Sequence, residues 1–176
     1  MAAKDNSNLD VMKTYKLFIG GSFPRTESGR YYTVRKKTGE LIANVCLSSR
    51  KDFRNAVVAA RNAGWCDKYS QLNSSVKPVA SSHFNFSVPE PMGVVGAFAS
   101  NSSALIGILE AFVPAICGGN TVVVLASEKL PTCSISLAEV LATSDVPGGV
   151  VNILTGERKE LLYHFTSHMD VNAFQI

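Results

Sequence analysis

The chain has 176 residues, of which 46% are hydrophobic, and a formal net charge of +3. This size and composition suit one globular domain with a packed core and exclude a disordered tail. The small charge, with one isolated basic cluster at Arg35, Lys36 and Lys37, argues against nucleic-acid binding. No run of about eighteen apolar residues is present, so we expect no membrane association and a cytoplasmic protein.

The four cysteines stand at positions 46, 66, 117 and 133. None forms a C-x-x-C pair, and no histidine lies at a zinc-like interval from any of them. We therefore expect no metal site and interpret all four as reduced cysteines in the core.

The first part of the chain predicts a small β structure. Residues 1–14 are polar and aperiodic, which predicts a flexible tail. Residues 15–23 read as two short strands around a Gly-Gly turn. Residues 31–34 and 41–45 flank a second turn and predict an N-terminal antiparallel β hairpin.

A helix and then a linker follow. Ser49 and Asp52 offer caps before apolar residues at helical spacing, and Gly64 predicts the end of this helix. Residues 69–85 are rich in Ser and Asn, include a proline and lack apolar periodicity. We interpret that stretch as a loop or linker.

The second half predicts a parallel sheet. Residues 94–98 and 121–125 are continuous apolar runs without polar alternation, as expected for strands buried on both faces. A helix over 104–117, ended by Gly118-Gly119, completes a βαβ unit. Four further elements are predicted over residues 131–176. They are a helix with Pro131 in its first turn, a third strand at 150–154, another helix, and the beginning of another strand.

This order predicts an α/β fold, a partial Rossmann-like parallel sheet with flanking helices. In open sheets of this class, ligands bind outside the carboxyl ends of the strands. Residues 99–103 and 126–129 are therefore the candidate ligand loops.

Three long motifs, in order and at matching separations, resemble the aldehyde dehydrogenase superfamily. They are PMGVVG at 91–96, PAICGGNTVVVLASE at 114–128 and PGGVVNILTG at 147–156. The resemblance spans residues 15–176 and implies an incomplete cofactor-binding domain, in which the linker at 69–85 replaces two helices. The segment HMDVNA at 168–173 is most similar to the second, degenerate module of family 16 aldehyde dehydrogenases.

The resemblance implies NAD or NADP as cofactor and the oxidation of aldehydes to carboxylic acids. The positions implied to contact the cofactor match the family's two loops and the turn after the third strand. They are Phe98, Ser100, Asn101, Leu125, Ser127, Glu128 and Gly156.

The chain departs from the family at several of these places. Ser102 stands where the family has the asparagine that donates to the oxyanion of the intermediate, so it is a weak catalytic candidate. Leu125 and Ala126 replace the Lys-Pro pair whose lysine holds the adenosine ribose, which implies weak or lost cofactor binding. Arg158 or Lys159 either attracts a phosphate or is simply solvated.

Two further implications concern activity and partners. The family's thiolate nucleophile and its activating glutamate lie beyond the part that this chain matches, so we expect no activity from the chain alone. A sheet that stops early leaves an open edge and an uncovered face, which predicts self-association or pairing with another aldehyde-dehydrogenase-like chain. The alternatives are a non-catalytic assembly module that retains the fold, and a βαβ domain for an unrelated nucleotide or phosphate ligand.

Overall fold

The computed structural model describes residues 12–36, 38–63, 75–77, 83–87 and 90–175. Of the predicted tail at 1–14, the first eleven residues lie outside this part. Cys66 and the predicted helix stop at Gly64 also lie outside it.

The centre of the molecule is a four-stranded parallel sheet with the order β8-β7-β6-β9. Its strands are β6 (Val94–Phe98), β7 (Thr121–Leu125), β8 (Val151–Leu154) and β9 (Ala173–Gln175). Helix α2 (Ile106–Cys117) connects β6 to β7, α3 (Pro131–Ala142) connects β7 to β8, and α4 (Arg158–Ser167) connects β8 to β9. The predicted α/β architecture is confirmed.

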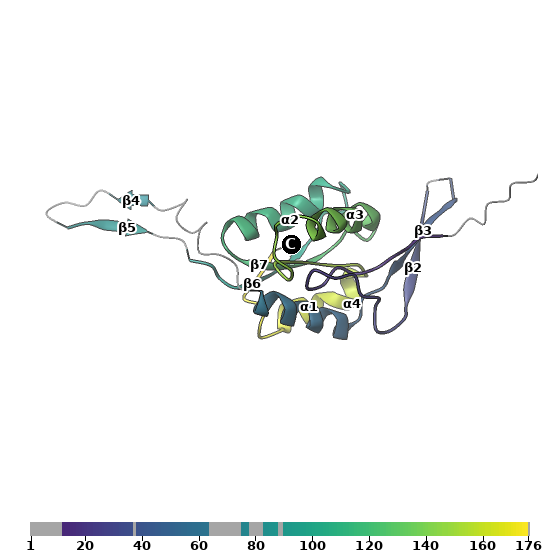
Figure 1. Cartoon of the computed structure of the whole chain (residues 1–176), viewed down its shortest axis with the longest axis horizontal. Helices are drawn as coiled ribbons and strands as arrows, with labels where there is room; N and C mark the ends of the chain where they lie inside the picture. Colours follow the sequence, from purple (N-terminus) through teal and green to yellow (C-terminus); the bar gives the residue numbers. More distant parts are fainter. Residues whose placement is uncertain (1–11, 37, 64–74, 78–82, 88–89, 176) are drawn as a thin grey trace, which may run out of the picture.

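Helices cover both faces of this sheet. Helices α2 and α3 lie on one face, and α4 and α1 (Arg50–Asn62) lie on the other (Figure 1). The expectation of an uncovered face is therefore wrong, because α1 comes from before the sheet and occupies the second face beside α4.

The alternation of side chains along β7 explains why its sequence is apolar throughout. Val122 and Val124 belong to the core cluster that contains α2 and α3. Val123 and Leu125 belong to the cluster that contains α1 and α4. All four are fully buried, as expected when both faces of a parallel sheet are covered.

A smaller sheet lies at one end of the molecule, with the order β1-β3-β2 (Figure 1). Strands β2 (Tyr31–Arg35) and β3 (Leu41–Cys46) form the predicted antiparallel hairpin. Strand β1 (Thr14–Tyr15) pairs parallel with β3. That parallel pairing is absent from the sequence-based prediction.

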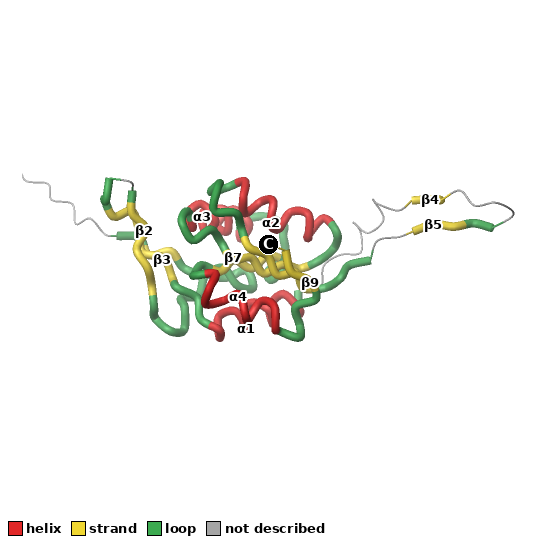
Figure 2. Tube along the Cα trace, turned by 180° about the vertical axis from the view of Figure 1, so that it is seen from behind, coloured by secondary structure: helices red, strands yellow, loops and turns green. Residues whose placement is uncertain are grey.

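A second hairpin begins within the predicted linker and ends just beyond it. Strands β4 (Ser75–Lys77) and β5 (Asn85–Ser87) pair antiparallel and lie apart from the helices and the main sheet (Figure 2). The interpretation of residues 69–85 as a loop is wrong for β4. Each strand has only three residues, which is too short for its apolar alternation to predict a strand.

Asn152 of β8 joins the N-terminal segment to the sheet. Its fully buried amide donates to the carbonyls of Gly149 at 2.7 Å and Val122 at 3.2 Å, and its Oδ1 accepts from the N–H of Gly20 at 2.9 Å. The outer side of β8 is also paired, because Phe18 exchanges two backbone hydrogen bonds with Ile153. The outer side of β9 pairs with no other described strand, so the open edge lies there.

The start of α1 has the predicted caps. The Ser49 hydroxyl accepts from the Asp52 N–H, and the Asp52 carboxylate accepts from the Ser49 N–H at 2.8 Å. Asp52 is buried, and it also accepts from the Thr26 hydroxyl at 2.5 Å. The capping box therefore also anchors the segment that precedes β2.

Candidate functional site

The carboxyl ends of β6, β7 and β8 meet at one edge of the main sheet. The N–H of Ala99 donates to the carbonyl of Leu125 at 2.9 Å, and the N–H of Ala126 donates to the carbonyl of Leu154 at 2.8 Å. The ladder thus continues just past the strands and holds the two predicted ligand loops side by side. A third loop, residues 155–157, follows β8 and leads into α4.

Asn101 ties the first loop to the second. Its Oδ1 accepts from the Ser127 hydroxyl at 2.8 Å and from the Glu128 N–H at 3.1 Å. The Ser127 Oγ in turn accepts from the Leu130 N–H at 3.3 Å, just before α3. The structure therefore brings these predicted residues together, and they satisfy one another's polar groups.

Ser102 is exposed and pairs within its own loop. Its hydroxyl lies 2.7 Å from the Ser100 hydroxyl, and its N–H donates to Ser100 Oγ at 3.2 Å. Behind it, Gly107 at the start of α2 packs so closely that an added Cβ would lie 2.9 Å from the Ser100 carbonyl oxygen. Ser102 is thus held in a tight turn. Its part in stabilising an oxyanion stays a prediction.

Arg158, the first residue of α4, crosses the site. Its backbone N–H donates to a Glu128 carboxylate oxygen at 2.5 Å. Its guanidinium donates to the carbonyl of Ala99 and lies 5.5 Å from the centre of the Phe98 ring. The side chain is half-buried, and its Nε atom is buried without a hydrogen-bond partner. Of the two alternatives for Arg158, simple solvation is therefore wrong.

Arg158 lines two pockets. One has a volume of about 260 Å³ and also includes Phe98, Ser100, Asn101 and Glu110. The other has a volume of about 570 Å³ and is lined by Tyr32, Glu128, Gly156, Glu157, Arg158 and Lys159. Arg158 is therefore shared by both pockets, and a ligand that extended across the strand ends from one pocket to the other would contact it.

Tyr32 contributes a buried hydroxyl to the larger pocket. That hydroxyl has no hydrogen-bond partner. Burial, and secondarily the nearby Glu128 and Glu157 carboxylates, raise the pKa of Tyr32 well above its ordinary value. Sequence reasoning missed Tyr32, because it lies in the N-terminal hairpin, far along the chain from the ligand loops.

The remaining predicted residues differ in exposure. Phe98 and Gly156 are buried at the pocket walls. Leu125 is fully buried in the core between the sheet and α1 and α4, and it lines neither pocket at this edge. Its contact with a cofactor stays a prediction that the geometry does not favour.

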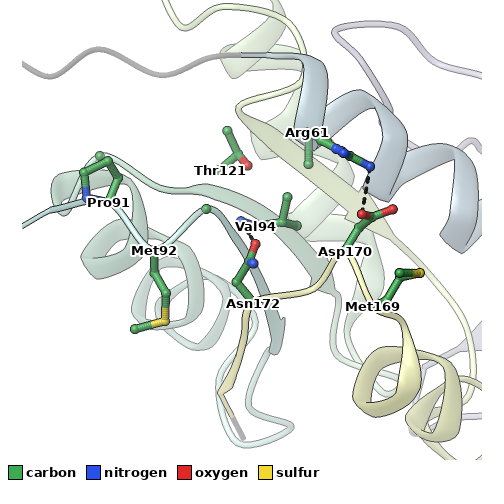
Figure 3. A pocket seen from close by; sticks show the side chains of 11 residues that line it. Arg61, Pro91, Met92, Val94, Thr121, Met169, Asp170 and Asn172 are labelled. Atoms are coloured by element: carbon green, nitrogen blue, oxygen red, sulfur yellow. Dashed lines mark hydrogen bonds and ion pairs between the residues drawn. The ribbon is translucent and has the colours of Figure 1, made fainter.

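A further pocket lies at the opposite, amino ends of β6 and β7, and Figure 3 shows it from close by. Its polar groups are engaged with one another. Arg61 forms an ion pair with Asp170 at 2.8 Å, and Asn172 Oδ1 accepts from the Val94 N–H at 2.9 Å (Figure 3). The exposed side chains of Met92 and Met169 form its rim. Because this is the wrong end of the strands for ligands of α/β sheets, we do not assign it as the functional site.

The cysteines give no catalytic arrangement. Cys46 is buried as predicted, but Cys117 and Cys133 are exposed, so the interpretation of those two as core residues is wrong. They lie at the end of α2 and near the start of α3, off the buried faces of these helices.

Within the described ranges, no group of three or more His, Cys, Asp or Glu side chains could hold a metal ion. None of the described helices is long and apolar enough to cross a membrane.

A doubly covered parallel sheet with loops gathered at its carboxyl edge defines the class of doubly wound α/β proteins. Residues 62–176 match the model of the aldehyde dehydrogenase family. The chain belongs to this family.

Curated relatives agree over part of their length. Aldehyde dehydrogenase 1A1 of Rattus norvegicus is 33% identical over 135 residues, which cover 76% of this chain and 26% of the relative. Retinal dehydrogenase 2 of Homo sapiens is 31% identical over 230 aligned residues, covering 94% of this chain and 44% of the relative. The chain thus spans less than half the length of these relatives. The second alignment is longer than the chain itself, so it includes stretches that this chain lacks.

Solved structures share the fold at low sequence identity. The NAD+ complex of an aldehyde dehydrogenase from Bacillus cereus has a TM-score of 0.80 at 18% identity, and the match covers 92% of this chain and 45% of that one. A 3,6-anhydro-L-galactose dehydrogenase in complex with NADP has a TM-score of 0.79 at 18% identity, and the match covers 92% of this chain and 46% of that one.

Proposed function

We propose that this chain is part of the cofactor domain of an aldehyde-dehydrogenase-like protein, and that it does not oxidise aldehydes by itself. The activity proposed for the whole protein is the NAD(P)-dependent oxidation of aldehydes to carboxylic acids. Its membership of the family and the NAD+ and NADP complexes of structural neighbours support this proposal.

The observation that carries the proposal is the position of Arg158. The Arg158 guanidinium lies over the ring of Phe98 and donates a hydrogen bond to the carbonyl of Ala99. The Arg158 backbone N–H donates to the Glu128 carboxylate. Ser127 and Asn101 are also engaged with each other. A dinucleotide would have to displace these contacts, so the residues present do not fit it well.

The residues in the Lys-Pro place favour the same conclusion. Leu125 and Ala126, which stand in the Lys-Pro place, are both buried and carry no donor for a ribose hydroxyl. Losing such a charge-assisted contact costs of order 1 to 3 kcal/mol, or about tenfold to a hundredfold in affinity. We therefore propose that NAD(P) binding by this chain is weak or lost.

The cysteines favour the same conclusion. Thiolate catalysis needs a base or another activating group beside the sulfur. Among the described residues no cysteine forms a hydrogen bond with a histidine, and Cys46 is buried away from solvent.

The finer assignment, to the degenerate second module of family 16, rests on Ser102 and on the segment at 168–173. A cytoplasmic location is proposed from the name of one relative, "Aldehyde dehydrogenase, cytosolic 1" of Elephantulus edwardii.

The test is an activity assay of the purified chain with short aliphatic aldehydes and either NAD+ or NADP+. Formation of reduced nicotinamide is followed by absorbance, and a complete aldehyde dehydrogenase serves as the positive control. We expect no turnover above the protein-free rate from a chain that melts cooperatively. Aldehyde-dependent and cofactor-dependent turnover would refute the proposal.

A second candidate function is assembly with another chain of this type. Phe84, just before β5, and Phe86, within β5, are 73% and 58% exposed, and their ring centres are 5.5 Å apart. Among the described strands, β9 offers an open edge. Exposed aromatic pairs and open strand edges favour association. Sedimentation velocity should show a self-associated wild type and a more monomeric Phe86→Ser variant. Tyr163→Ser, at a 73% exposed residue on α4, is the matched control. A monomeric wild type would exclude self-assembly.

A further inference from the structure

A second polar groove lies between α1 and α4, on the outer face of the molecule. Its volume is about 510 Å³, within the usual range for small-molecule sites. The buried ring of Phe53 forms an apolar wall, and Arg50, Arg54, His164 and His168 supply nitrogen atoms around it. The groove shares no lining residue with the two pockets at the carboxyl edge of the sheet.

Helix geometry explains why these four side chains converge. Arg50 and Arg54 are four residues apart on α1 and so lie on one helix face, whereas His164 is in the last turn of α4 and His168 is the C-cap residue that follows this helix. The two helices are locked together by Phe53 and Phe165, whose ring centres are 4.4 Å apart.

The groove carries unbalanced positive charge. No carboxylate lines it. The acidic side chains nearest in sequence are engaged elsewhere: Asp52 with Thr26 and Ser49, Glu160 with Arg30, and Asp170 with Arg61. Within the described part of the chain, neither Arg50 nor Arg54 forms an ion pair.

The His168 ring is oriented by its neighbours. Its Nδ1 accepts a hydrogen bond from the Asp170 N–H at 3.2 Å, and its ring meets the Phe53 ring edge-on at 5.7 Å. Because Nδ1 is an acceptor, the neutral ring carries its hydrogen on Nε2, which is therefore a donor. Ser167 and Tyr163 add hydroxyl groups to the lining.

We propose that this groove binds a small molecule that carries a phosphate group, such as a phosphate ester or a diphosphate. Two guanidinium forks with no competing carboxylate match phosphate oxygens in charge and geometry. The volume exceeds what one phosphate needs, and the rings of Phe53 and Tyr163 offer apolar surface for an organic part. The inference is independent of whether the sheet edge binds a dinucleotide.

The probe is inorganic pyrophosphate, titrated into the whole chain at low salt and followed by calorimetry and by amide chemical shifts. We expect saturable binding, with shifts concentrated at residues 50–54 and 163–168. Arg54→Gln should weaken binding about tenfold, the loss of one charge-assisted contact. Arg35→Gln removes the same charge from the β2–β3 hairpin, where Arg35 donates to the Gly39 carbonyl, and should change affinity less than about twofold.

Three results of the titration would overturn the proposal. They are the absence of saturable binding, shifts that map elsewhere, and equal weakening by Arg54→Gln and Arg35→Gln. Co-sedimentation with phosphatidic acid vesicles, without a response to free pyrophosphate, would also overturn it and would assign the basic groove to a membrane surface. The shift map is recorded on the wild type, so the conclusion does not depend on the folding of a variant.

Discussion

A carboxylate oxygen of Glu128 accepts a hydrogen bond at 2.5 Å from the backbone N–H of Arg158, and so joins the loop after β7 to the first residue of α4. The same arginine reaches the carbonyl of Ala99 after β6. Three loops that would otherwise be free to receive a ligand are thereby connected within the chain. This relationship leads to the first prediction.

Arg158→Ala should strengthen NAD+ binding about tenfold relative to the wild type. The substitution frees the Phe98 ring and the Ala99 carbonyl, whose contacts with the guanidinium a cofactor would otherwise displace at a cost of about 1 to 3 kcal/mol. Calorimetric titration measures the change. Arg35→Ala, which removes the same charge from the β2–β3 hairpin at an exposed position that lines neither pocket, is the matched control and should leave affinity unchanged. Equal or weaker binding by Arg158→Ala would show that the arginine does not obstruct the cofactor.

Asn152→Ala should lower the free energy of unfolding by about 3 kcal/mol, because it removes three hydrogen bonds of a fully buried amide, to the Gly20 N–H and to the carbonyls of Val122 and Gly149. Urea unfolding followed by circular dichroism measures the change. Asn55→Ala at an exposed position of α1 should change stability by less than about 0.5 kcal/mol. A loss below about 1 kcal/mol in Asn152→Ala would mean that water replaces these bonds.

Tyr32 should make the folded state sensitive to alkaline pH. Burial raises the pKa of its phenol in the folded state above the unfolded value of about 10, so the unfolded chain releases this proton first. The stability associated with neutral Tyr32 is therefore complete below about pH 10 and is lost as pH rises above it. Denaturant midpoints across this range measure the loss, which Tyr32→Phe should reduce.

Tyr31→Phe, at the neighbouring 61% exposed position, is the control and should keep the alkaline loss. At neutral pH, Tyr32→Phe should be neutral or slightly stabilising, because the buried hydroxyl it removes has no partner. A marked destabilisation at neutral pH would mean that the hydroxyl is hydrogen-bonded in solution.

Cysteine labelling should distinguish the three described cysteines. Brief exposure of the native chain to a maleimide, followed by peptide mass spectrometry, should label Cys117 and Cys133 and spare Cys46. Labelling in denaturant is the control and should reach all three. Protection of Cys117 or Cys133 in the native chain would indicate that an associated chain covers α2 or α3.

The sequence predicts the main sheet well because its signals are local. The unbroken apolar run from Thr121 to Leu125, the Gly118-Gly119 stop and Pro131 at the start of a helix each act within a few residues, and the structure follows all three. The β4–β5 hairpin is missed because its strands have only three residues each, too few for a periodic signal. The exposure of Cys133 does not follow from its residue type but from its position on α3, outside the buried helix face that carries Ile135 and Ala138.

The candidate site was predictable in location but not in its contacts. The rule that ligands bind at the carboxyl ends of strands led to Ser127 and Glu128. The contacts of Arg158 with Ala99, and the approach of Tyr32 to the same pocket, join residues far apart in sequence and depend on how the elements pack. The signal in the sequence is the charged run Glu157, Arg158 and Lys159 after Gly156, where the family has further glycines.

The most direct test of the central claim is a calorimetric titration of the purified, cooperatively folded chain with NAD+ and with NADP+. With Arg158 across the strand ends and no lysine at position 125, we predict no saturable binding below about millimolar concentration, which corresponds to a binding free energy weaker than about −4 kcal/mol. Saturable binding at micromolar concentration would contradict the account, and would mean that the cleft accepts the cofactor despite these residues.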